Sequence, residues 1–489
     1  MDLPGRNIAD RIPPEIMLRI LTIYHDAIAP VQRLLYVCKS FKALIEDHSR
    51  FWNRLYILEP IPEDLPHLER ILQLSRSQPL YVTLVLPGND AYEDTEPPEA
   101  DSAAAADLCI RRLRDQQHRL ASLGVFAFRD GDIRAVARAL EGAQLPVLHE
   151  LWLADVVDQH TSENLHRLAK LPEPPVFIFD RAAPPPLLSV VRIEQRIARY
   201  AVAPMRGLTA LHLGTPAGSR CDELLDMLQI ATQGSPGLQC LGLGLCGVML
   251  PLSQTLREPQ SLPFPALLYL HLEGGSETIA WIVLWTLSAP ALKALHVMDH
   301  FFDPMELEHE EFLEWPQDPA ETFTQRFGPG GILPSPYASV QSLTLRNVGW
   351  LSLLPVLPNL RHLTLCWVHY VFSMVEYLGE PPEKAPELEV LTFEGDLIND
   401  EGRRLFLDVV RRKARKGRLR RVRMFHLQED GIGNRHPEEF MQSLRELVEV
   451  SYVNPHPRDF NMDGEALAHL YASATEVDDW EWHMAERSW

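Results

Sequence analysis

Few stretches of this 489-residue sequence have residue types and spacings that could support catalysis or cofactor binding, and a glycine motif is the first of them. The sequence GLGLCG at 242–247 has the G-x-G-x-x-G spacing of a dinucleotide-binding loop. Such a loop opens a helix, and an acidic residue about 20 positions later binds the ribose. Here VMLPLS follows, with a proline where the helix should begin, and no such acid stands at that distance. We therefore expect no cofactor.

The sequence also lacks nucleophile and metal-binding patterns. GGSET at 274–278 is not the G-x-S-x-G of a nucleophile elbow, and His296 and His300 lack between them the glutamate of H-E-x-x-H. No two cysteines form a C-x-x-C pair, so neither a zinc site nor a disulfide framework is predicted, and a reducing compartment is favoured. We expect a protein that is not an enzyme and holds no metal. The cysteines are Cys38, Cys109, Cys221, Cys240, Cys246 and Cys366.

The chain is organised by repeats of the pattern L-x-x-L-x-L, which recurs about every 29 residues. The motifs start at Leu120, Leu148, Leu208, Leu238, Leu267, Leu292, Val340, Leu360, Leu388, Leu419 and Leu447. The step from the second start to the third is about two periods, which indicates one degenerate repeat. The L-x-L part alternates as a half-buried strand does, and helical stretches at 219–234 and 399–417 lie between motifs. One strand and one helix per repeat predict an α/β solenoid, in which stacking buries the leucines.

This array resembles the leucine-rich repeat family from roughly Leu80 to Tyr452. That family usually places Asn or Cys three residues after the last leucine of the motif, and here only Cys246 fits, so we expect irregular curvature. Acidic stretches near 87–106 and 299–335 interrupt the repeats and are interpreted as surface insertions, the first of them flexible. The predicted domains are a non-repeat module at 1–60, the solenoid at 61–452 and a cap or tail at 453–489.

Between the last two leucines of each motif stands a residue that should point out from the inner, concave face of the strands. Solenoids bind partners on such faces, so we interpret this row as the binding surface for a protein substrate. On adjacent strands, about 5 Å apart, His271 and His296 could instead share a metal or form a pH-sensitive patch. The spacing supplies no further ligand, and partner contact is the sharper hypothesis. The candidate substrate-binding residues are Trp152, His212, His271, His296, Thr344, Thr364 and Arg423.

The segment before the repeats predicts two or three short helices. In RIPPEIMLRIL, residues 11–21, Pro14 suits the first helical position and Glu15 favours the positive helix end. A second apolar stripe at helical spacing occupies 31–45, and an aromatic pair follows at 51–52. A core this small supplies little stability by itself. Either it docks on the solenoid or a partner supplies the missing burial.

These residues resemble an F-box, as found in many fungal F-box proteins. The resemblance rests on three features: a match to the family's Leu-Pro pair before the first helix, here Ile12 and Pro13; a Val-Cys-basic stretch followed by an aromatic residue; and a closing Trp. The connection at 22–30 is spelled differently. It implies that the chain docks on the Skp-type adaptor of a ubiquitin ligase, and through it on a cullin, and holds a protein substrate on the solenoid without making bonds itself. The adaptor-binding residues that it implies are Ile12, Pro13, Ile16, Ile20, Leu34, Leu35, Val37, Cys38, Phe41, Leu44, Ile45 and Trp52.

Two alternatives remain open at this point. The short helices could merely cap the end of the solenoid, as terminal repeats require. The protein could then be a repeat-based interaction scaffold with no role in ubiquitin transfer.

Charge and hydropathy limit the other partners. The net charge of −21 opposes non-specific binding to nucleic acid or to an anionic membrane. The longest apolar run, at 279–287, is too short to span a bilayer. We therefore expect an intracellular protein, cytoplasmic, nuclear or both. The basic stretch 403–423 could be a nuclear import signal or a phosphate-binding patch, but its apolar stripe at 405–410 favours the solvated face of a repeat helix.

Overall fold

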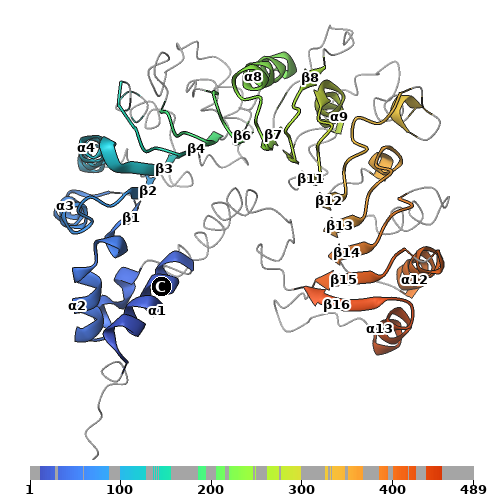
Figure 1. The fold of residues 1–489 in the computed structure, drawn as a ribbon, viewed down its shortest axis with the longest axis horizontal. Helices are drawn as coiled ribbons and strands as arrows, with labels where there is room; N and C mark the ends of the chain where they lie inside the picture. The colour runs from blue at the N-terminus through green and yellow to red at the C-terminus, as the bar shows by residue number, and fades with distance from the viewer. Residues whose placement is uncertain are drawn as a thin grey trace, which may run out of the picture. The chain divides into compact units, whose positions relative to one another are not determined.

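The computed structural model forms two compact units, residues 1–204 and 205–489 (Figure 1). None of the helices that it describes is long and apolar enough to cross a membrane. The residues described are 12–27, 31–58, 60–86, 100–127, 136, 138, 140, 142–155, 185–193, 205–214, 220–245, 248, 261–274, 277–298, 325–328, 331, 333–346, 351–366, 385–394, 400–416, 418–425 and 437–453.

The first unit starts with short helices and continues as a parallel sheet. The helices are α1 (Pro14–Ala27), η2 (Val31–Tyr36), α2 (Lys39–Asp47) and η3 (Ser49–Trp52). The strands, each paired with the next in chain order, are β1 (Arg54–Leu58), β2 (Leu80–Val85), β3 (Leu120–Ala127), β4 (Glu150–Asp155) and β5 (Val190–Ile193). Strand β5 lies within the step of double length, where the sequence predicted one degenerate repeat.

The helices between these strands lie close to two predicted boundaries. The connections are η4 (Pro62–Asp64) and α3 (Leu65–Leu74), then α4 (Ala100–Asp115) and η5 (Gln117–Arg119). Strand β1 already belongs to the sheet, so the strand architecture begins inside the segment 1–60. Helix α4 occupies part of the predicted flexible insertion at 87–106, because its alanine-rich run has high helix propensity and buries Ala105 and Cys109. Residues 87–99 lie outside the described part.

The second unit repeats the same plan. Its strands, again parallel and paired in chain order, are β6 (Ala210–Gly214), β7 (Cys240–Gly244), β9 (Tyr269–Glu273), β11 (Ala294–Met298), β12 (Ser342–Arg346), β13 (His362–Cys366), β14 (Val390–Glu394), β15 (Arg421–Phe425) and β16 (Glu449–Val453). The helical connections are α8 (Cys221–Gly234), α9 (Glu277–Thr286), η7 (Leu351–Val356), α12 (Asp400–Arg415) and α13 (Glu438–Arg445). A second, two-stranded sheet joins β8 (Leu262–Pro263) to β10 (Leu287–Ser288). This strand-and-helix alternation is consistent with the predicted solenoid.

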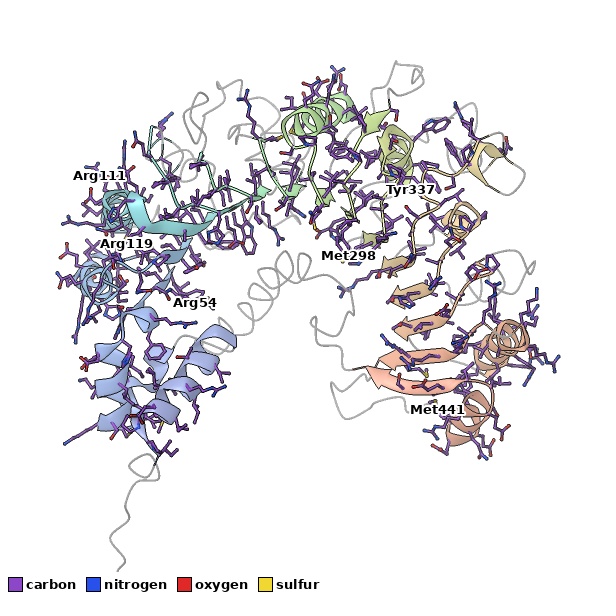
Figure 2. All side chains as sticks on the ribbon, in the orientation of Figure 1. Arg54, Arg111, Arg119, Met298, Tyr337 and Met441 are labelled. Atoms are coloured by element: carbon purple, nitrogen blue, oxygen red, sulfur yellow. The ribbon has the colours of Figure 1, made fainter. Side chains whose placement is uncertain are left out.

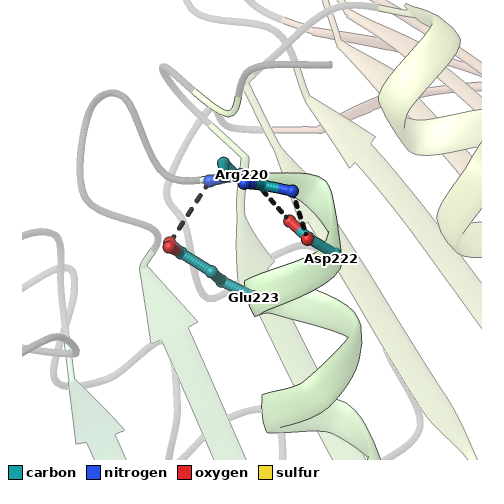
Figure 3. A network of polar contacts seen from close by, with 3 residues as sticks. All are labelled: Arg220, Asp222 and Glu223. Carbon is teal, nitrogen blue, oxygen red and sulfur yellow. Dashed lines mark hydrogen bonds and ion pairs between the residues drawn. The ribbon is translucent and has the colours of Figure 1, made fainter. Parts of the chain in front are cut away.

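The two helices predicted by capping signals are confirmed as α8 and α12. Helix α8 begins at Cys221, and the charged residues before and in its first turn bind one another (Figure 3). The Arg220 main-chain N–H donates to Glu223 Oε2 at 3.3 Å, and its guanidinium donates to both Asp222 oxygens at 2.9 and 2.7 Å. These carboxylates also suit the positive end of the helix. The predicted cap, Ser219, and most of the predicted insertion 299–335 and of the tail 453–489 lie outside the described residues.

The leucines of each L-x-L pair form the core, as the repeat pattern predicts. In β12, Leu343 and Leu345 are completely buried, and their register partners in β13, Leu363 and Leu365, are equally buried. Side chains at i and i+2 share a face of a strand. Consecutive repeats therefore stack leucine on leucine, and the helices cover that side of each sheet (Figure 1).

Buried polar side chains hydrogen-bond to the connections between strands. Arg119, labelled in Figure 2, is 6% exposed. Its guanidinium donates to the Leu72 carbonyl in the last turn of α3 and to Ser75 Oγ just after that helix, both at 2.9 Å. In the second unit the buried Tyr337 hydroxyl donates to the Leu284 and Leu287 carbonyls at the end of α9. Both side chains satisfy carbonyls that a helix end leaves without an intrahelical partner.

Candidate functional site

Helix α1 divides its apolar residues between two faces. The Pro13 carbonyl accepts hydrogen bonds from the Ile16 and Met17 N–H groups, both at 3.0 Å, which starts the helix. Met17 and Leu21 point into the core and are almost fully buried. Residues three and four apart share a helix face, so a separate stripe stands away from this core. The stripe consists of Ile16 (50% exposed), Ile20 (49%) and Ile23 (58%).

The other side of the module is held by α2 and by the closing tryptophan. Cys38 caps α2, because its Sγ accepts from the Phe41 N–H at 3.4 Å. Trp52 is buried, and its Nε1 donates to the Ile45 carbonyl at 2.8 Å. The core of the module contains Met17, Leu21, Ile45, Phe51 and Trp52, and Ile71 and Leu74 of α3 pack against it. The short helices therefore do dock on the first repeat.

Docking on the repeat still leaves large apolar side chains in solvent. Tyr36 at the end of η2 is 92% exposed and the adjacent Val37 is 60% exposed. Helices α1 and η2 are in contact. Single exposed hydrophobic residues are normal on a protein surface, but a concentration of them marks an interaction site. We call this set the open apolar face; it comprises Ile16, Ile20, Ile23, Tyr36 and Val37.

The predicted adaptor-binding residues divide into three groups. Those on the surface are Pro13, Ile16, Ile20 and Val37. Those that are half-buried are Ile12, Leu34, Leu35, Cys38, Phe41 and Leu44. Ile45 and Trp52 are buried and belong to the core that holds the helices together.

Two members of the open apolar face were missed by the sequence analysis. The seven-residue spacing from Ile16 to Ile23 could have identified Ile23 as part of the same stripe. No pattern in the sequence separates Tyr36 from the apolar residues around it, since its exposure depends on how η2 packs.

In the second unit, the predicted substrate-binding residues lie in one continuous row, in which each residue is paired with its neighbour on the next strand. We call it the middle row, because each member is the central residue of its strand. In order from β6 to β16 the members are His212, Gly242, His271, His296, Thr344, Thr364, Thr392, Arg423 and Ser451. The predicted adjacency of His271 and His296 on neighbouring strands is confirmed.

The row is more buried than a solvent-facing surface should be. His212, His271 and Thr344 are only 8%, 7% and 6% exposed, whereas Thr364 and Arg423 are half-buried. Neighbouring strands lie about 4.8 Å apart, so side chains in one row cover one another. The row therefore offers a partner less accessible surface than the strand pattern by itself indicates.

The three histidines of the row form a connected group. The imidazoles of His271 and His296 face each other with Nδ1 atoms 3.0 Å apart, and His271 Nε2 lies 3.3 Å from Glu273 Oε2. The His212 ring lies over Gly242, where a Cβ would stand 2.3 Å from its Nδ1. The pKa of His296 is well below its usual value because of burial and the neighbouring His271, while Glu273 raises it and Arg346 lowers it further. Among the described residues, no group of three or more His, Cys, Asp or Glu side chains is arranged to hold a metal ion.

Trp152, the predicted contact residue of the first unit, is packed between neighbours. Its ring meets Phe126 edge-on with centroids 4.5 Å apart, and the Arg192 guanidinium carbon lies 4.4 Å from its centroid on the other strand. Only 8% of Trp152 is exposed. Trp152 therefore packs between an aromatic ring and a guanidinium and leaves little of its surface free for a partner.

The basic stretch 403–423 covers most of helix α12, whose apolar side is buried. Phe406, Val409 and Val410 lie in the core, and Arg411 pairs with Asp408 at 2.6 Å. This geometry agrees with the interpretation of the basic residues as the solvated face of a repeat helix.

Comparison with protein families identifies the N-terminal module. Residues 9–58 match the model described as F-box-like. This segment contains α1, η2, α2, η3 and β1, and with them the whole open apolar face. F-box domains typically bind Skp-type adaptors. No curated protein matches the chain.

Proposed function

We propose that this protein is the substrate-recognition subunit of a Skp–cullin–F-box ubiquitin ligase. Its F-box-like module binds the adaptor, and through it the cullin, while the strand-and-helix repeats hold a protein substrate. The subunit makes and breaks no bonds itself. It raises the effective concentration of substrate beside the ubiquitin-carrying enzyme, and that enzyme supplies the chemistry. A cytoplasmic location, a nuclear location or both would suit this role.

The observation that carries the proposal is the open apolar face within the F-box-like module. The module has a packed core and a packed contact with α3, so these five side chains are not needed to complete either. Their exposure costs solvation free energy that a partner would recover by burying them. A helix pair that only caps the repeats would expose charged side chains at such positions.

The test is direct binding of the full chain to a purified Skp-type adaptor. The double variant Ile16→Asp, Ile20→Asp places two charges on the exposed stripe without touching the buried residues. A matched control is Ile230→Asp, since Ile230 on α8 is 54% exposed and belongs to the other unit. We expect the wild type and the control to bind and the double variant to fail.

The scaffold alternative predicts a different result. If folded wild-type protein does not bind the adaptor, the short helices serve only to cap the repeats. Circular dichroism of the double variant shows whether a loss of binding comes from unfolding.

A further inference from the structure

Arg423, the middle-row residue of β15, is a half-buried cation. Its neighbours along the strand, Val422 and Met424, are 0% and 2% exposed and face the core. Successive side chains of a strand point to opposite faces, so Arg423 lies on the side of the sheet away from the helices (Figure 1). Among the described residues its guanidinium has no hydrogen bond and no ion pair. Partial burial of such a charge costs free energy that a bound anion would recover.

Hydroxyl side chains flank Arg423 on both neighbouring strands. Thr392 of β14 and Ser451 of β16 are its register partners, and neighbouring strands lie about 4.8 Å apart. Thr392 is 8% exposed and Ser451 is half-buried. A guanidinium has five donors and no acceptor, and a hydroxyl can donate as well. The three side chains can therefore direct their donors to one anionic group.

The acid on the adjoining strand, Glu449 of β16, pairs with Arg421 and not with Arg423. Arg421 Nη2 donates to Glu449 Oε2 at 2.9 Å. Arg421 Nε is buried and has no acceptor among the described residues. Strands β14 to β16 therefore carry more donors than acceptors on this face.

The whole described middle row, from β6 to β16, contains no aspartate or glutamate. The chain has 67 acidic residues against 46 Lys and Arg, so a shortage of acids does not explain this. A row without acids in an acidic protein is complementary to an acidic partner. The corresponding residues of the described strands in the first unit also lack an acid: Tyr56, Thr83, Gly124, Trp152 and Arg192.

We propose that the middle row selects substrates with an acidic segment, and that Arg423, with Thr392 and Ser451, binds one Asp or Glu carboxylate of that segment. This assignment of a chemical class to the substrate rests on the proposed function. A planar guanidinium can bind both oxygens of a carboxylate at once. Arg423 thereby fixes which position of the bound segment carries the acid.

The test measures binding of a hexaglutamate peptide to the full chain by fluorescence anisotropy. The peptide is amidated and carries an uncharged dye, so that only its side chains bring negative charge. Salt at about 0.15 M screens charges more than about 8 Å apart and limits the effect of the net charge of the chain. We expect the wild type to bind and Arg423→Gln to weaken binding about tenfold or more, because a charge-assisted contact is lost. Circular dichroism shows that the variant is folded.

The matched control is Arg404→Gln, because Arg404 is an exposed arginine of α12, on the helix side of the sheet. It should leave the affinity unchanged. Equal losses in the two variants would overturn the site and indicate general charge attraction, and so would a folded wild type that does not bind the peptide. Arg423→Lys should recover only part of the affinity, and full recovery would overturn the two-oxygen contact.

Two further measurements test the identity of the ligand. A hexapeptide with a single phosphoserine among serines that binds more tightly than hexaglutamate would overturn the carboxylate assignment. The acid-containing stretch 454–489 lies outside the described residues. If its deletion strengthened peptide binding in the wild type but not in Arg423→Gln, the site would belong to that stretch and the substrate assignment would be overturned.

Peptide binding needs neither adaptor nor cullin. Arg423→Gln should bind the adaptor as the wild type does, so a failure of the Arg423 site leaves adaptor binding intact. A failure of adaptor binding leaves the peptide result unchanged.

Discussion

Alanine substitutions across the open apolar face should weaken adaptor binding in proportion to the surface that each side chain can still bury. Full burial of an isoleucine-sized side chain contributes about 1.5–3 kcal/mol. Ile16 and Ile20 already have half of their surface covered, at 50% and 49% exposed. Each can therefore contribute about 1 kcal/mol, and Ile16→Ala should weaken binding about fivefold.

Tyr36 provides the sharper part of this prediction, because it is 92% exposed and can bury nearly its whole side chain. Aromatic side chains bury large areas and are frequent anchors at interfaces. We expect Tyr36→Ala to cost at least about 2 kcal/mol, or about 30-fold in the dissociation constant. Isothermal titration calorimetry with purified adaptor measures both values on the same scale.

The reasoning fails if the order is reversed. A loss for Tyr36→Ala no larger than that for Ile16→Ala would mean that exposed area does not decide the contribution of these residues. Ile230→Ala, on a similarly exposed isoleucine outside the module, should leave the affinity unchanged. Equal loss in that control would show that the binding surface is not the module.

Arg119→Met should lower the free energy of unfolding of the first unit by about 2–4 kcal/mol, because buried acceptors lose their charged donor. Urea titration measures this loss. The control Arg111→Met breaks only an exposed ion pair and should lower the free energy of unfolding by at most about 0.5 kcal/mol. Gly242→Ala should lower the free energy of unfolding by about 1–3 kcal/mol, because the new methyl group overlaps the His212 ring. In a His212→Ala background the same substitution should lower it much less. Equal losses of stability in both backgrounds would contradict the overlap. The depressed pKa of His296 means that the unfolded chain binds more protons than the folded chain below about pH 6.5. The free energy of unfolding of the wild type should therefore fall as the pH drops from about 6.5 to 5, and it should fall by up to about 2 kcal/mol more than that of His296→Gln. Chemical denaturation at each pH measures both. The same pH dependence in the two proteins would refute this.

Much of the architecture could be predicted because the repeat encodes it locally. The L-x-L alternation located the strands of the second unit, and the capping signals located α8 and α12 within two residues. The step of double length located β5. Helix α4 takes up the last part of the stretch 87–106, where the alanine run favours a helix although the acid content indicated a surface loop.

The candidate sites were predicted less completely, because periodicity identifies a face but not its exposure. Ile45 follows the helical pattern of the module as Ile16 does, and Trp52 was expected to close the module, yet both lie in its core. Trp152 and His271 follow the strand pattern, yet their neighbours cover them. These differences depend on which side chains of other segments reach them.

The sequence by itself determined the order of strands and helices, the F-box resemblance of the N-terminal module and the adjacency of His271 with His296, because each depends on spacing along the chain. Only the tertiary structure decided which apolar residues remain open and which cations lack a carboxylate partner among the described residues. Docking of the module on α3 buries one side of it and leaves Tyr36 and the isoleucine stripe outside. Pairing of β11 with β12 brings Arg346 beside Met298. Exposure and electrostatic environment depend on segments far apart in the sequence, and packing alone brings those segments together.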